Sequence, residues 1–75
     1  MQPITLAQAR AAQPAALRTF EHLSSVNGVG IARMGRDYVL KVNLREPIPR
    51  GVDVPTQVDG VPVRVQVTGA VRRLA

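Results

Sequence analysis

The sequence predicts an α+β fold, in which one N-terminal helix packs on one face of a three- to four-stranded, mainly antiparallel sheet and the other face stays open. Three observations support this prediction. Apolar residues recur at helical spacing near the N-terminus, side chains alternate over residues 38–44, and a valine stands at every second position over residues 61–67. Because one helix covers only one side of a sheet, the opposite side is expected to face solvent.

The chain length predicts a single small domain over residues 1–75. A domain of this size buries only about 60% of the surface of its unfolded chain, so its stability is marginal unless something reinforces it. The 75 residues contain no cysteine and one histidine, which excludes disulfides and argues against a structural metal site. Oligomerisation remains as a way to stabilise the fold.

The helix is expected over residues 14–24. Pro14 suits the first position of a helix, where its missing N–H costs nothing. An apolar stripe follows at spacings of three, formed by Leu17, Phe20 and Leu23. Residues 1–13 are expected to be loosely packed or kinked, with Thr5 capping a short turn. A break is predicted near Gln13, because proline inside a helix removes a hydrogen bond.

A β-hairpin is predicted on the two sides of a two-residue turn at Gly35-Arg36. The covered face of this hairpin pairs Ile31 with Leu40 and Val29 with Val42. The open face receives Gly28, Gly30 and Ala32 from the first strand, and Val39, Lys41 and Asn43 from the second. The turn geometry and the apolar alternation give the same register, which supports the assignment.

A further strand is predicted over residues 61–67, with its valines on the covered face and Arg64, Gln66 and Thr68 on the open face. Pro62 lacks an N–H, so the start of this strand is placed at a sheet edge. Residues 45–60 are rich in proline and glycine and predict an extended connection, in which residues 56–58 form a short arm against the strand.

The segment "GVGIARMG" resembles the start of a dinucleotide-binding loop but lacks its chemistry. Arg33 stands where the third glycine is required, and no helix follows. The glycines are therefore expected to shape the sheet. Catalysis needs a nucleophile, a base and an orienting group in one pocket, and His22 with scattered carboxylates does not supply them. We expect no enzymatic activity, no metal, no cofactor and no small-molecule substrate.

The net charge of +5 suggests a polyanionic partner, but the favoured explanation is a compositional bias toward arginine, with the charges spread singly as solubilising groups. The sequence shows neither a signal peptide nor an apolar run of membrane-spanning length, so a cytoplasmic protein without a membrane partner is expected. Phe20 and Tyr38, the only aromatic residues, are placed on the covered side, which argues against base stacking on the open face.

Two hypotheses for the function follow. The first is a non-enzymatic interaction module that binds a protein partner or a second copy of itself, with pairing of sheet edges as the simplest route. The alternative is weak, sequence-independent binding of nucleic acid or another polyanion through a basic sheet face. The candidate interaction face consists of Gly28, Gly30, Lys41, Asn43, Arg45, Arg64, Gln66, Arg72 and Arg73.

Three stretches, "VNGVGIARM", "YVLKVNLREPIP" and "VDGVPVRVQVTGAV", resemble a small uncharacterised bacterial domain that also occurs at the N-terminus of some proteins related to trypsin-like serine proteases. The resemblance spans about residues 20–71 and rests on glycine, valine and proline positions. It implies a compact module that begins with a helix. It carries no protease activity over, because the "GDSGG" nucleophile segment does not occur in this chain.

Overall fold

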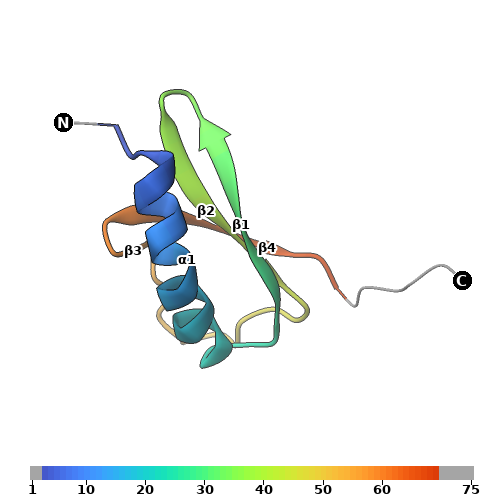
Figure 1. Ribbon diagram of the computed structural model, residues 1–75. Helices are drawn as coiled ribbons and strands as arrows, with labels where there is room; N and C mark the ends of the chain where they lie inside the picture. The colour runs from blue at the N-terminus through green and yellow to red at the C-terminus, as the bar shows by residue number, and fades with distance from the viewer. Residues whose placement is uncertain (1–2, 70–75) are drawn as a thin grey trace, which may run out of the picture.

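The computed structural model describes residues 3–69 and consists of one helix packed on a four-stranded sheet (Figure 1). The elements are α1 (Leu6–Glu21), β1 (Val26–Met34), β2 (Asp37–Leu44), β3 (Gln57–Val58) and β4 (Val61–Val67). The strand order is β1-β2-β4-β3. The outer pairs β1–β2 and β3–β4 are antiparallel, whereas the central pair β2–β4 is parallel. The predicted α+β class, with one covered and one open sheet face, is confirmed.

The helix α1 is longer than predicted and runs through Pro14 without a break. The prediction that the helix begins at this proline, after a break near Gln13, is wrong. Ala9 and Ala12 are fully buried, so the segment before the proline is packed rather than loose. Pro14 and Arg10 both lie on the exposed side of the helix, where water can solvate the Arg10 carbonyl that loses its helical partner.

The N-terminus of α1 is fixed by a capping box, of which the sequence predicted Thr5 as a cap but not the reciprocal bond to Gln8. Thr5 Oγ1 accepts a hydrogen bond from the Gln8 backbone N–H at 3.1 Å, and Gln8 Oε1 accepts one from the Thr5 N–H at 2.8 Å. These reciprocal bonds satisfy backbone donors that no helical carbonyl reaches. They anchor the helix eight residues before the position that the sequence prediction gave.

The buried stripe of α1 also differs from the predicted one. Leu17 is 38% exposed, whereas the stripe that contacts the sheet consists of Ala9, Ala12, Ala16 and Phe20. These positions recur at spacings of three and four, as one face of a helix requires. Alanines at the contact allow the helix to lie close to the sheet, and the Phe20 ring fills the space at the C-terminal end of the helix.

The predicted hairpin is confirmed residue by residue. Gly35 begins the two-residue turn with a φ of +60°, which favours glycine. Ile31 pairs with Leu40 and Val29 with Val42, on the side that α1 covers. A bulge at Asn27 interrupts the pairing near the start of β1, and the Asn27 amide donates to Thr68 Oγ1 and to the Gly69 carbonyl beyond the end of β4.

The core lies between α1 and the inner faces of β2 and the β3–β4 hairpin. Leu40, Val42 and Leu44 of β2 are fully buried there, together with Phe20 and Val61. The predicted alternation of β2 is therefore correct. No helix in residues 3–69 combines the length and the apolar character needed to cross a membrane.

Pro62 does not lie at a sheet edge, because β3 pairs with this part of β4, with Gln57 opposite Pro62. Val63, the next residue, donates its N–H to Thr56 on the β3 side at 2.9 Å. The Pro62 nitrogen therefore faces the β2 side, where the ladder begins only with the pair Leu40 and Val63. The missing donor falls just before that ladder, which explains how the proline is tolerated.

Candidate functional site

The open face of the sheet carries two rows of residues that the strand register aligns across β1, β2 and β4. One row is Gly30, Lys41 and Arg64, and the next is Gly28, Asn43 and Gln66. A side chain built on either glycine would meet no atom within 4 Å. The β1 side of this face is therefore a flat backbone surface beside the longer side chains of β2 and β4.

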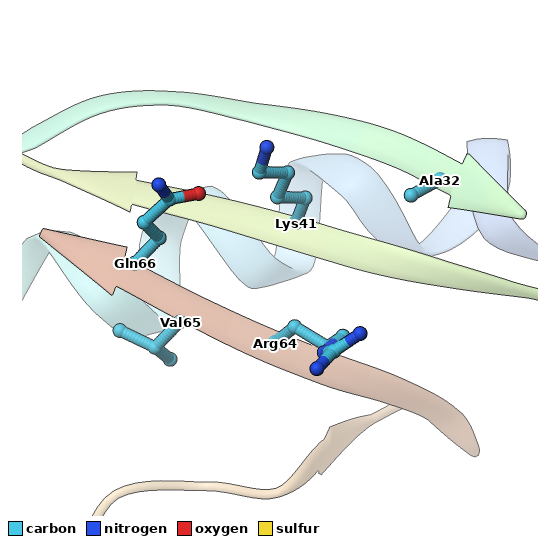
Figure 2. A pocket seen from close by; sticks show the side chains of 5 residues that line it. All are labelled: Ala32, Lys41, Arg64, Val65 and Gln66. Atoms are coloured by element: carbon cyan, nitrogen blue, oxygen red, sulfur yellow. The ribbon is translucent and has the colours of Figure 1, made fainter. Parts of the chain in front are cut away.

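A shallow hollow of about 420 Å³ lies on this face (Figure 2). Its lining residues are Ala32, Lys41, Arg64, Val65 and Gln66. In Figure 2 the Lys41 side chain rises from β2 toward β1, and the Gln66 amide points toward the same space from β4. The lining includes two cations and no acidic residue, so the hollow has a positive potential that suits an anion.

Arg64 lies along the sheet rather than projecting freely into solvent. Its Nη1 approaches the Met34 sulfur at 3.3 Å, so the side chain crosses β2 to reach β1. Val39 of β2 is only 4% exposed, although the alternation places it on the open face. The path from Arg64 to Met34 passes over the part of β2 that carries Val39, which accounts for the burial of this valine, while the charged end of the arginine is exposed.

Asn43 is half-buried, whereas Lys41, Arg64 and Gln66 of the same face are exposed. Its Oδ1 atom is buried and accepts no hydrogen bond from residues 3–69. A buried acceptor without a donor costs about 1–3 kcal/mol. In the strand register Asn43 lies between Gly28 of β1 and Gln66 of β4.

Most residues of the sequence-predicted interaction face are brought together. Gly28, Gly30, Lys41, Asn43, Arg64 and Gln66 occupy the two rows, and Arg45 follows directly after β2. The Arg45 N–H donates to the Ser25 carbonyl at 2.8 Å, which fixes its backbone beside the start of β1. Arg72 and Arg73, which the prediction also included, lie outside the described residues.

The outer edge of β4 is a second feature; an edge was predicted at the start of this strand, near Pro62, whereas the free edge is its second half. β3 contains two residues and pairs only with Val61 and Pro62. Successive residues of a strand direct their N–H and C=O groups to opposite sides. Thr68 donates to Leu44 on the β2 side, and Val63 donates to Thr56 on the outer side, so the groups of Val65 and Val67 also point outward.

The side chains along this edge are exposed to solvent, as its outward backbone groups are. Val65 is 39% and Val67 is 48% exposed, although both belong to the valine row on the helix side of β4. Within residues 3–69 this half of β4 pairs with β2 on its inner side and with no strand on its outer side, and Figure 2 shows β3 beside the opposite end of β4. The edge from Arg64 to Val67 therefore offers free hydrogen-bonding groups next to apolar side chains.

The other edge strand, β1, is partly closed. Gln13 of α1 donates from Nε2 to the Val29 carbonyl oxygen at 3.0 Å. The two-residue turn makes Met34 and Asp37 a hydrogen-bonded pair, so alternation directs the groups of Val29, Ile31 and Arg33 outward. One of these outward carbonyls is thus occupied, and a charged residue near the end of the strand further disfavours pairing.

The described part of the chain brings together no group of three or more His, Asp or Glu side chains that would hold a metal ion. His22 is exposed at the C-cap of α1. Asp37 accepts a hydrogen bond from the Ile4 N–H at 2.7 Å, which ties the segment before α1 to the start of β2. His22 and Asp37 are therefore part of the helix end and of a backbone contact, and neither lines the hollow on the open face.

Comparison with models of known protein families, with curated protein sequences and with solved structures finds no match to this chain. The resemblance to the bacterial module found with protease-related proteins stays a prediction.

Proposed function

We propose that the protein is a non-enzymatic interaction module that self-associates through the outer edge of β4. The proposal rests on one observation. The backbone N–H and C=O groups of Val65 and Val67 point outward, and the side chains of both residues are exposed. A sheet edge of this kind is a template for another strand. A second copy of the chain supplies a strand of identical length and matching alternation.

One antiparallel register satisfies these groups particularly well. When two β4 strands pair about a twofold axis at Gln66, Val65 of each copy lies opposite Val67 of the other. Both residues then form hydrogen-bonded pairs, and every outward N–H and C=O of this stretch finds a partner. On the helix side the four valines meet across the interface and lose water-exposed apolar surface.

The ends of the paired segment fit the same register. Val63 is opposite Gly69 of the second copy, and the Val63 N–H is already bonded to Thr56. Gly69 has a φ of +73°, a conformation that turns the chain out of a strand at this point. The second strand therefore leaves the sheet where β3 would obstruct it.

Competing registers are less favourable. An axis at Val65 would place Val67 of the second copy against Val63, where Thr56 already occupies the N–H. An axis at Arg64 would place two arginines opposite each other, and like charges in directly opposed positions are destabilising. In the register centred on Gln66, Arg64 faces Thr68 and no like charges meet.

The expected association is weak. Each added backbone hydrogen bond contributes a net of about 0.5–1.5 kcal/mol, and ordering two chains into one particle costs several times that amount. We therefore expect a concentration-dependent equilibrium that becomes visible near about 100 µM rather than a permanent dimer. An extended strand from another protein could pair with the same edge of β4 and would then compete with the second copy.

Sedimentation velocity tests the proposal with two matched double variants. Val65→Lys/Val67→Lys places lysines opposite lysines in the proposed register. Val52→Lys/Val54→Lys adds the same charge at two other exposed valines, which are 39% and 42% accessible. At about 100 µM the wild type and the second variant should sediment above the 8.1 kDa monomer, and the first should not. A monomeric wild type, or equal loss in both variants, would overturn the proposal.

A further inference from the structure

The open face of the sheet is a separate surface from the outer edge of β4. We define the basic face as Lys41, Arg45 and Arg64, together with the hollow between β1 and β4. Lys41 and Arg64 are paired across neighbouring strands, which lie about 4.8 Å apart. Arg45 lies in the bend that directly follows the end of β2 at Leu44.

We propose that the basic face binds the phosphate backbone of duplex nucleic acid. Lys41 and Arg64 lie beside a floor of small β1 residues, Gly28, Gly30 and Ala32, where no side chain larger than a methyl group prevents close approach. The lining of the hollow contains no carboxylate that would repel phosphate. The long, flexible side chains of lysine and arginine can each meet a phosphate on a strand that carries one charge per about 3.4 Å of axis.

The residues of the face favour a duplex over a single strand. Single-stranded nucleic acid is usually held by aromatic side chains that stack on unpaired bases. Phe20 is fully buried in the core, and Tyr38 packs against the same core on the covered side. The open face in residues 3–69 therefore offers phosphate contacts without a stacking platform, which suits a partner whose bases are already paired.

No acidic residue in the described part of the chain lines the hollow, and Glu46 is the one that directly follows a cation of the face, Arg45. Glu21 lies at the end of α1 on the covered side, and Asp59 lies in the turn between β3 and β4. Asp37 belongs to the same face of β2, but it is four residues from Lys41 and its carboxylate bonds the Ile4 N–H. The positive charge of the face is therefore not neutralised at its centre.

This binding does not depend on self-association. The hydrogen bonds of an edge pairing lie in the plane of the sheet, whereas the side chains of Lys41 and Arg64 stand across that plane. The variants that test the β4 edge leave all three cations of the basic face unchanged. Either proposal can therefore fail while the other holds.

Fluorescence anisotropy with a short labelled DNA duplex tests the proposal on the full chain. With three phosphate contacts, the affinity should fall about 40-fold between about 50 and 200 mM salt. Lys41→Met and Arg64→Met should each reduce the logarithmic salt slope by about one. Methionine keeps a long apolar stem over Val39, and thermal melts of the same samples show whether the fold is retained.

Arg18→Met is the matched control, since Arg18 is exposed on α1, on the other side of the sheet. It removes the same charge and should leave the salt slope unchanged. Equal losses for Arg18→Met and Arg64→Met would assign the binding to net charge and overturn the proposal. So would the absence of binding at the lower salt concentration, or tighter binding of the corresponding single strand.

Discussion

The Gln13 side chain donates a hydrogen bond from Nε2 to the Val29 carbonyl oxygen at 3.0 Å, and so links the middle of α1 to the outer edge of β1. This contact makes the two edges of the sheet unequal. The β1 edge has a carbonyl occupied by the helix, whereas the outward groups of Val65 and Val67 on β4 are free of any such partner within residues 3–69.

Gln13→Ala should therefore have two effects. Loss of the hydrogen bond should lower the free energy of unfolding by about 0.5–1.5 kcal/mol, measured in denaturant melts. The freed Val29 carbonyl should also increase association through β1, seen as a higher average mass in light scattering. Arg10→Ala, at an exposed position on the same helix, is the control. Identical behaviour of the two variants would show that the Gln13 contact neither stabilises the fold nor protects the edge.

Leu40→Ala should cost about 2–5 kcal/mol, since Leu40 is fully buried beneath α1 and its truncation leaves a cavity. This loss approaches the whole stability expected for a small domain, so the variant should be largely unfolded at room temperature. Lys41→Ala, on the opposite face of β2, should change stability by less than about 0.5 kcal/mol. A reversed order in denaturant melts would contradict the register of the β1–β2 hairpin.

Ala16→Leu and Leu17→Ala test the identity of the buried stripe on α1. Ala16 is fully buried against the sheet, so added methyl groups there should destabilise the protein by about 1–3 kcal/mol through overpacking. Leu17 is 38% exposed, and its truncation should cost less than about 1 kcal/mol. If thermal melts showed Leu17→Ala to be the more destabilising change, the buried stripe would be the predicted one that contains Leu17, and the assignment of Ala16 to it would be wrong.

Thr5→Ala should lower stability by about 1 kcal/mol, because it removes the acceptor for the Gln8 N–H at the start of α1. Thr5→Ser retains the hydroxyl and should lose only a fraction of that amount. Far-UV circular dichroism during chemical denaturation measures both variants. An equal loss in Thr5→Ser and Thr5→Ala would assign the effect to the Thr5 methyl group instead of the cap.

The hairpin was predictable because two independent local signals agree on it. Gly35 fixes the position of the turn, and the alternation of residues 38–44 shows which side chains face the helix. The pairing of Ile31 with Leu40 therefore follows from short-range pattern alone. The same kind of alternation places Lys41, Asn43, Arg64 and Gln66 on one open face. The candidate face could therefore be named, in the described part of the chain, before its geometry was known.

Other features depend on contacts that local pattern does not encode. Pro14 predicts a helix start, but the buried alanines on both sides of it stabilise one continuous helix. Val39 reads as a solvent-facing residue, yet Arg64 crosses from β4 and covers it. The free β4 edge depends on strand order and on the two-residue length of β3, which depend on long-range packing.

The most direct test of the account is amide hydrogen exchange, resolved by residue with NMR, at about 20 µM and about 1 mM protein. Self-association through β4 predicts that exchange of the Val65 and Val67 amides slows at the higher concentration, because both donate across the proposed interface. The outward amide of Ile31 on β1 should exchange at the same rate in both samples. Unchanged rates at Val65 and Val67, or slowing at Ile31 instead, would contradict the claim that the outer edge of β4 is the interaction surface.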